Sequence, residues 1–199
     1  MAGTRARHSR LDPQRLGSLI AAVFGLVYVM ANSGPLPQGL AFTLQVVAVV
    51  LVFVALVVAI VRGRSLALPD ESARGGFGRG YWVVVAVEVV AIAAGVAVLN
   101  GPLGAPYVSV AWISLVVGLH FFALARVWRE PLFGWLGGPI ALCGLVGLAA
   151  AAFGASAAFI ALVAGMVPAA LLFAFSALGA TVRGPRAPSG SAPPGRGAP

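Results

Sequence analysis

Residues 40–61 read LAFTLQVVAVVLVFVALVVAIV, and this stretch decides the fold class. Only Thr43 and Gln45 interrupt its apolar side chains, and none of its residues carries a charge. An α-helix needs about 20 predominantly apolar residues to cross roughly 30 Å of bilayer hydrocarbon. The stretch meets that length, and it lacks the two-residue alternation of an outer-membrane barrel strand. We therefore expect a transmembrane helix here.

The composition extends this expectation to the whole chain. Of the 199 residues, 60% are apolar and 9% are charged, and the mean hydropathy is +1.01. A soluble domain carries roughly 25% charged residues and could not bury this much apolar surface. Most of the chain lies in apolar runs, which leaves no room for a soluble catalytic domain. The lipid bilayer is therefore the expected partner.

The basic charge of the chain does not indicate nucleic-acid binding. All 13 basic residues are arginines, and most of them lie beside apolar runs. The segment 74–80, RGGFGRG, resembles an arginine- and glycine-rich nucleic-acid contact or a phosphate loop, but it lacks the lysine and the preceding strand of such a loop. We interpret it as a solvated linker and expect no nucleic-acid partner.

Six apolar runs of spanning length predict an all-α fold, an integral membrane bundle of six transmembrane helices. Residues 1–15 form a basic N-terminal segment, 16–182 the membrane domain, and 183–199 a tail rich in Gly, Pro and Ser that we expect to be flexible. The boundary between the last two helices rests on Gly154, and Pro168 predicts a kink in the sixth. The expected helices cover about 16–33, 40–61, 81–100, 106–127, 132–153 and 155–182.

The arginines separate the ends of these runs into two sides. The connectors after the first, third and fifth runs carry no charge, and arginines are retained on the cytoplasmic face of a membrane. We therefore expect a multi-pass protein of the cell membrane with both termini cytoplasmic. A cleaved signal peptide is the alternative for the basic start and first run, but that run exceeds the usual length of about 7 to 15 residues. The arginines on the other side are Arg5, Arg7, Arg10, Arg15, Arg62, Arg64, Arg74, Arg79, Arg126, Arg129, Arg183, Arg186 and Arg196.

Small residues four apart predict close packing of the last two helices. We expect 132–153 and 155–182 to pack tightly against one another inside the bundle, with a dimer interface as the alternative. The pairs are Gly134 and Gly138, Gly147 and Ala151, Ala161 and Gly165, and Gly165 and Ala169.

Aromatic side chains near the expected helix ends are typical of membrane-interface anchors. We assign this role to Tyr28, Tyr81, Trp82, Tyr107, Trp128 and Trp135.

Familiar signatures of enzymes and cofactor sites do not occur in the sequence. It has no G-x-S-x-G elbow, no H-E-x-x-H zinc helix and no Cys and His cluster. His8 lies in the N-terminal segment, which leaves His120 without a second axial ligand for a haem. Cys143 is the single cysteine and cannot form an internal disulfide. We therefore assign no catalytic residue, no metal and no cofactor.

Two ionisable side chains remain inside the expected helices, Glu88 in 81–100 and His120 in 106–127. A charge near a helix centre costs roughly 2.5 to 3.5 kcal/mol on insertion scales, so such residues face the bundle interior and find partners. Both residues lie roughly 10 Å from the same boundary at about 1.5 Å per residue, on helices joined by a short connector. We predict that Glu88 and His120 meet, either as a structural clasp or as a proton-handling or ligand site.

The residues around His120 also carry a resemblance. The stretch 116–125, VVGLHFFALA, with Pro131 following and Glu88 one helix earlier, resembles a group of uncharacterised small bacterial polytopic membrane proteins with a VGLHF-type motif. The resemblance covers roughly the third to fifth helices. It implies an inner-membrane protein and draws attention to Glu88 and His120, and it names no activity.

Three functions are compatible with these observations. A structural or interaction role in the cytoplasmic membrane ranks first, because the helices offer few polar groups besides Glu88, His120 and Gln45. A small proton-coupled transporter or channel using Glu88 and His120 ranks second, since transporters normally show interrupted helices and several polar groups near the midplane. An intramembrane enzyme ranks third. A protein partner or a second copy of the chain stays open.

Overall fold

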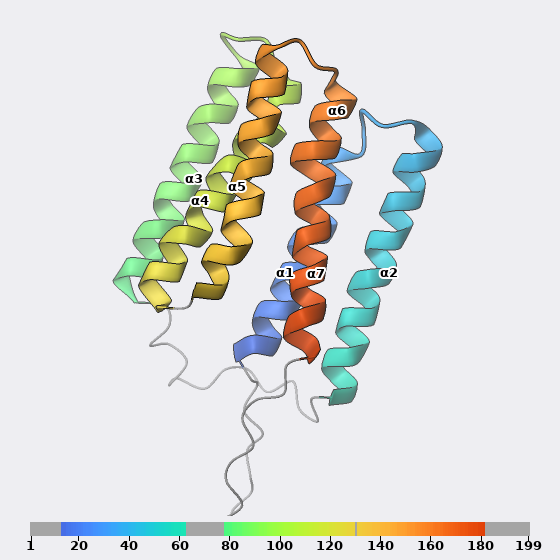
Figure 1. Ribbon diagram of the computed structural model, residues 1–199, viewed down its shortest axis with the longest axis vertical. Helices are drawn as coiled ribbons and strands as arrows, with labels where there is room; N and C mark the ends of the chain where they lie inside the picture. The colour runs from blue at the N-terminus through green and yellow to red at the C-terminus, as the bar shows by residue number, and fades with distance from the viewer. Residues whose placement is uncertain (1–12, 63–77, 130, 182–199) are drawn as a thin grey trace, which may run out of the picture.

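The computed structural model describes residues 13–62, 78–129 and 131–181. The 74–80 linker, except its last three residues, lies outside these ranges, as do residues 183–199 and most of 1–15. Within the ranges the chain is helical and has no strand (Figure 1). The elements in chain order are α1 (Pro13–Asn32), α2 (Gln38–Arg62), α3 (Arg79–Asn100), the 3-10 turn η2 (Pro106–Val108), α4 (Ser109–Trp128), α5 (Pro131–Ala152), α6 (Ala157–Ala161), the π-helical turn η3 (Leu162–Met166) and α7 (Val167–Thr181).

The helices have the length and apolar character of membrane spans. Five helical stretches in the described ranges are long and apolar enough to cross a bilayer, and the described side chains of α1 add a shorter apolar helix, Ser18–Asn32. These helices indicate a multi-pass membrane protein. The five stretches are Gln38–Val61, Arg79–Asn100, Pro106–Trp128, Pro131–Ala152 and Ala157–Leu178.

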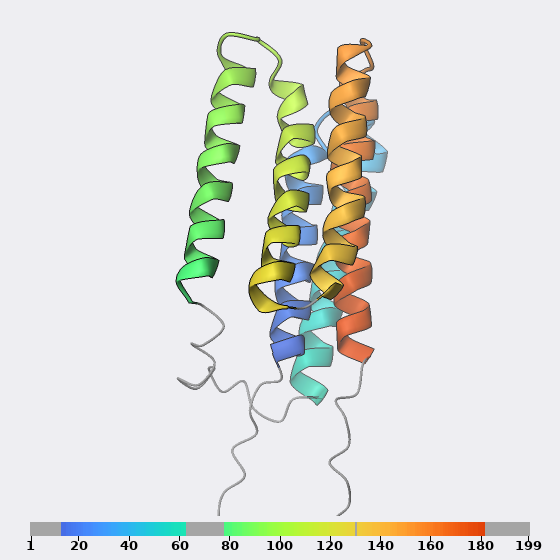
Figure 2. The ribbon, with the colours of Figure 1, turned by 60° about the vertical axis from the view of Figure 1, so that its left-hand side comes forward.

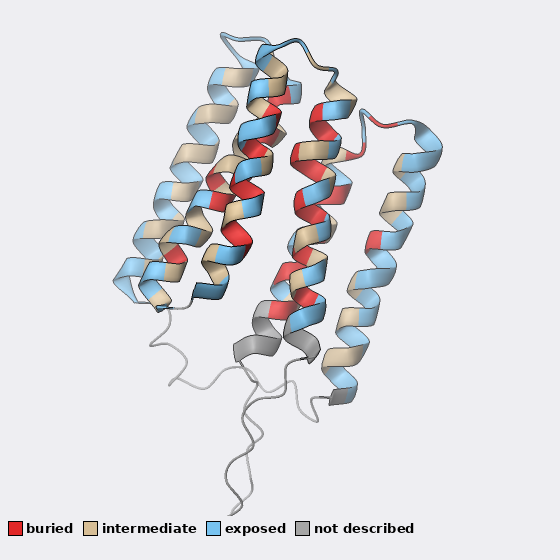
Figure 3. Cartoon of the chain, in the orientation of Figure 1, coloured by how far each residue is buried: buried red, intermediate tan, exposed pale blue. Residues whose placement is uncertain are grey.

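The outer surface of the bundle is apolar. α3 has no buried residue at all, and most of α2 is exposed as well (Figure 3). Their exposed side chains are chiefly valines, such as Val61 at 73% and Val90 at 67% exposure. A soluble protein rarely exposes continuous apolar surface of this extent. Lipid is the medium in which such a surface is stable.

The helices pack as a central group with one helix attached on each side. α4 packs against α5 and α1 against α7, and the π turn η3 contacts α1, α4 and α5. α3 lies outside α4, and α2 lies outside α1 (Figures 1 and 2). Consecutive long helices run in opposite directions, so the first residues of α1 and the last of α7 lie at the same end of the bundle (Figure 1).

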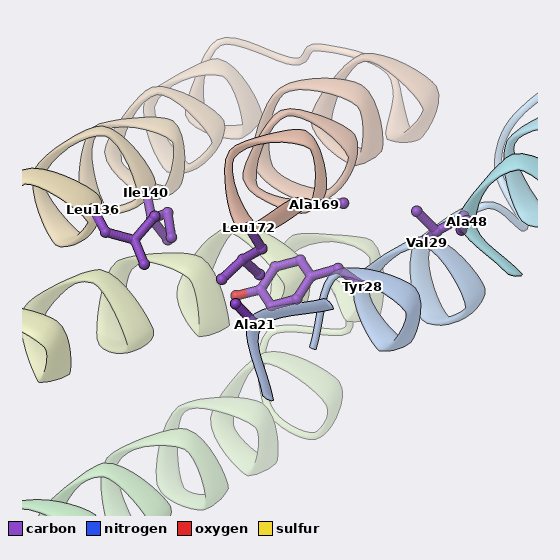
Figure 4. Close-up of a cluster of buried hydrophobic side chains, with 8 residues drawn as sticks. All are labelled: Ala21, Tyr28, Val29, Ala48, Leu136, Ile140, Ala169 and Leu172. Atoms are coloured by element: carbon purple, nitrogen blue, oxygen red, sulfur yellow. The ribbon is translucent and has the colours of Figure 1, made fainter. Parts of the chain in front are cut away.

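A cluster of buried apolar side chains joins the central helices (Figure 4). Tyr28 of α1 lies beside Leu172 of α7 in this cluster, and Ile140 of α5 has no exposed surface. Tyr28 was expected to be an anchor at a membrane interface, and this was wrong, because only 6% of Tyr28 is exposed. A tyrosine is stable inside the bundle when its hydroxyl has a hydrogen-bond partner, which here is Ser114 of α4.

Glycines bring α5 closest to α4. A Cβ atom on Gly144 would lie 2.3 Å from the Leu115 nitrogen, and one on Gly137 would lie 2.6 Å from the Gly118 carbonyl oxygen. The expected packing of the fifth helix on the sixth is present as well, although it is not the closest approach of α5. Gly147 does meet Ala164 of η3, but the backbones approach most closely between α5 and α4. Small residues indicate that another helix can pack closely at that position, but they do not indicate which helix it is.

The connection from α5 to α6 is a short turn. Gly154 adopts a left-handed conformation with φ +79, and the next amide, that of Ala155, bonds back to the Ala150 carbonyl. This is the pattern that commonly ends a helix at glycine. Ser156 then caps α6 by accepting from the Phe159 amide. A kink was expected at Pro168, the second residue of α7, and the π turn η3 ends two residues before it, at Met166.

Candidate functional site

Four contacts join α3 to α4 along their whole length, and we call this set the α3–α4 seam. The helices run antiparallel, so low residue numbers on one face high numbers on the other. From the arginine-bearing end of α3, the contacts are Tyr81 with Trp128, Glu88 with His120, Ala91 and Gly95 with Trp112, and Asn100 with Ser109.

Glu88 and His120 form the ionisable contact of the seam. His120 Nδ1 lies 3.0 Å from Glu88 Oε2, and the two side chains are 12% and 18% exposed respectively. Glu88 follows Arg79, the first residue of α3, by nine positions, and His120 precedes Trp128, the last residue of α4, by eight. At about 1.5 Å per residue both lie roughly 12 to 14 Å from the same end of the bundle. The structure thus brings the two residues together at one level.

The contact is short without being an aligned hydrogen bond. His120 Nδ1 is buried, and no atom among the described residues lies in hydrogen-bond direction from it. The imidazole torsion has a broad minimum, so rotation of the ring can bring an N–H toward the carboxylate. The pair therefore joins α3 to α4 either as an ion pair or as a neutral hydrogen-bonded pair.

Aromatic rings close the seam between this pair and the arginine-bearing end. Tyr81 stacks on Trp128 with ring centroids 5.8 Å apart, and Trp128 contacts Phe133 of α5 at 5.0 Å. His120 itself lies edge-on to Phe121 at 5.9 Å. Tyr81, Trp82 and Trp128 lie at the helix ends where interface anchors are expected.

A tryptophan in a notch fixes the seam on the other side of the pair. The Trp112 indole fills the space that a side chain on Gly95 would need, since a Cβ there would lie 1.9 Å from Trp112 Nε1. The same nitrogen donates a hydrogen bond of 3.0 Å to the Ala91 carbonyl oxygen. The seam is therefore positioned by shape as well as by polar contact.

Sequence reasoning missed this notch, although a signal for it exists. Tyr81, Glu88 and Gly95 follow one another at intervals of seven residues, the spacing that keeps side chains on one face of a helix packed against a neighbour. The surrounding valines hide this face, because a helix that is apolar all round shows no amphipathic pattern.

The remaining candidate residues lie away from the seam. Gln45 of α2 donates a 2.6 Å hydrogen bond to Ser33 Oγ in the turn between α1 and α2. Cys143 is a free thiol in α5. Within the described part of the chain, no three His, Cys, Asp or Glu side chains gather as metal ligands would. The seam alone brings two ionisable side chains together inside the described helices.

Comparisons with protein-family models, with curated proteins and with solved structures find no match. The functional proposal therefore rests on the residues and contacts of this chain.

Proposed function

We propose that this protein is a six-span protein of the cytoplasmic membrane with a structural or interaction role. The sixth span is α1, in addition to the five stretches of spanning length. α1 comprises 20 residues, which extend about 30 Å at 1.5 Å per residue. α1 also packs against α7 and α2, both of which belong to those stretches.

The proposed orientation places both termini in the cytoplasm. It is supported by the one-sided distribution of the arginines and by the position of the first and last helix ends at one end of the bundle. An even number of spans places both termini on the same side of the membrane.

The structural role is supported chiefly by the hydrogen bonds of four polar side chains. Each of these side chains donates its hydrogen bond to a neighbouring helix or turn. In a transport pathway, by contrast, several polar groups would face a shared space. Such bonds fasten helices together in a medium that supplies no water to replace them. They run from Ser18 to the Ser176 carbonyl, from Ser114 to the Ala164 carbonyl, from Trp112 to the Ala91 carbonyl and from Gln45 to Ser33.

Glu88 and His120 then act as a clasp for α3. This helix has no buried residue, and α4 is its main neighbour, so few apolar contacts position it. A hydrogen bond between membrane helices contributes about 0.6 kcal/mol on average. Together with the Trp112 notch, this contribution selects one rotation of α3 against α4.

One observation favours a second candidate, a small proton-coupled transporter or channel. His120 Nδ1 is buried 3.0 Å from a carboxylate and has no aligned partner among the described residues. Ionisable residues that face one another inside a membrane are the usual components of proton relays.

Proton flux distinguishes the two candidates. The full chain is reconstituted in liposomes containing a pH-sensitive dye, and a proton gradient is imposed. The structural role predicts that the gradient decays no faster than in liposomes holding Glu88→Gln or no protein. Decay that the wild-type chain accelerates and Glu88→Gln abolishes would replace the structural role with transport.

A positive test of the interaction role is mass spectrometry of the purified protein. A structural protein is expected to carry only bulk lipid, and an interaction protein is expected to carry a stoichiometric protein partner. A bound metal, haem or other small molecule in stoichiometric amount would contradict both.

A further inference from the structure

The last span is a continuous helix that contains a π turn. α6 and α7 are joined by the π turn η3, in which the Val167 amide bonds to the Leu162 carbonyl, five residues earlier. π-helical turns inside α-helices are rare and often mark functional positions. This turn lies in the interior of the bundle, where Ala164 is fully buried.

Pro168 accounts for the π turn. In a regular α-helix the amide of residue 168 would bond to the carbonyl of Ala164, but proline has no N–H. The Ala164 carbonyl therefore lacks its regular donor at a fully buried position. A buried carbonyl in this situation needs a donor from elsewhere.

Ser114 of α4 supplies that donor. Its hydroxyl donates a hydrogen bond of 2.5 Å to the Ala164 carbonyl oxygen, and its side chain has no exposed surface. Tyr28 Oη of α1 lies 3.3 Å from Ser114 Oγ. Because a carbonyl only accepts, the single Ser114 proton goes to Ala164, and the Tyr28 hydroxyl donates to Ser114. One chain of hydrogen bonds thus links α1, α4 and the π turn.

Both sides of the π turn have buried contacts, and on the α6 side Ile160 is fully buried in a cluster with Ala111 of α4. α7 is fixed to α1 by the bond from Ser18 to the Ser176 carbonyl and by Phe173, which packs over Gly25. Those contacts lie beyond the π turn and do not involve it. The π turn is held by the Ser114 bond and by close contacts of Gly165 with Asn32 and of Ala164 with Gly147.

We propose that the π turn is a hinge and that the Ser114 hydroxyl is its latch. Release of the bond to Ala164 lets α6 and the turn at 153–156 move while α7 stays docked on α1. Tyr28 keeps the latch oriented by donating to Ser114 Oγ. The hydrogen bonds of the device include neither Glu88 nor His120, so its test does not require the seam to transport protons.

Hydrogen exchange of the full chain in lipid nanodiscs, followed by mass spectrometry, tests the hinge. Ser114→Ala removes the latch and nothing else from the side chain. We expect amides in 157–167 to exchange roughly threefold to twentyfold faster, the range equivalent to one membrane hydrogen bond, while amides in 131–150 do not change. No change in 157–167, or an equal increase in every helix, would overturn the proposal.

Testing Ser114→Ala in a Pro168→Ala variant shows whether the latch acts on the Ala164 carbonyl. Pro168→Ala restores an N–H that can bond to this carbonyl, so alone it should slow exchange in 157–167. In its presence, Ser114→Ala should change exchange by less than about twofold. A Ser114→Ala effect that Pro168→Ala leaves unchanged would refute the latch.

Ser18→Ala is the matched control for this background. It also removes a buried serine hydroxyl bonded to a carbonyl of this span, that of Ser176, but the residue four positions on is Ala180, which has its own N–H. The effect of Ser18→Ala should therefore be the same in the wild-type chain and in the Pro168→Ala background. A Ser18→Ala effect that Pro168→Ala also suppresses would show that the background acts on the whole span, which contradicts a latch specific to Ala164.

Discussion

Glu88 on α3 and His120 on α4 face one another with Oε2 and Nδ1 3.0 Å apart. α3 has no buried residue, whereas α4 packs against α5 and the π turn in the centre of the bundle. The ionisable pair therefore connects the most weakly embedded helix to one of the best embedded. When few apolar contacts hold a helix, a polar contact contributes a larger share of the interactions that position it.

The proposed topology predicts the location of reporter fusions. Fusions after Arg64, Arg129 and Arg186 should report the cytoplasm, and fusions at Gly34 and Gly101 the opposite side, because arginines are retained inside. Enzymatic reporters active on only one side of the membrane measure this. A cytoplasmic signal at Gly101 would contradict six spans.

The closest approach of α5 to α4 predicts that Gly144→Ala destabilises the bundle by about 1 to 3 kcal/mol. The new Cβ would meet backbone atoms of Leu115 at 2.3 Å, so the helices must separate. Gly138→Ala is the matched control on the same helix, since its Cβ would lie 3.6 Å from Phe122 Cζ, in ordinary contact. Thermal unfolding in detergent should lower the midpoint for Gly144→Ala only, and equal midpoints would show that the helices are not in this contact.

The Trp112 notch predicts that Trp112→Phe costs about 1 kcal/mol or more, because it removes both the bond to the Ala91 carbonyl and part of the ring that fills the space at Gly95. Trp135→Phe is the control, since Trp135 is 80% exposed. Unfolding of the two variants in the same detergent gives the comparison. A larger loss for Trp135→Phe would be incompatible with the seam.

The class of fold, and the depth in the bundle at which Glu88 and His120 lie, could be predicted from the sequence. Apolar runs such as 40–61 predict helices of spanning length, and five such stretches are present in the described residues. Counting residues from the helix ends places Glu88 and His120 at one depth because the helical rise is constant. Both inferences depend only on local sequence.

Neighbours and helix faces could not be predicted in the same way. Tyr28 is buried because Ser114, which is distant in sequence, lies beside its hydroxyl. Gly144 meets α4, although its sequence is equally compatible with packing on the following helix. In lipid, helices are apolar on all sides, so hydropathy does not distinguish the packed face from the lipid face. These features depend on long-range contacts.

The Glu88–His120 clasp is tested most directly by a double-mutant cycle with Glu88→Gln and His120→Ala, read as the free energy of unfolding in detergent or bilayers. Glu88→Gln with Ser18→Ala provides a matched pair without contact. The clasp predicts a coupling energy of about 0.6 to 1.7 kcal/mol for Glu88 with His120 and none for the control pair. Strictly additive effects of Glu88→Gln and His120→Ala would contradict it.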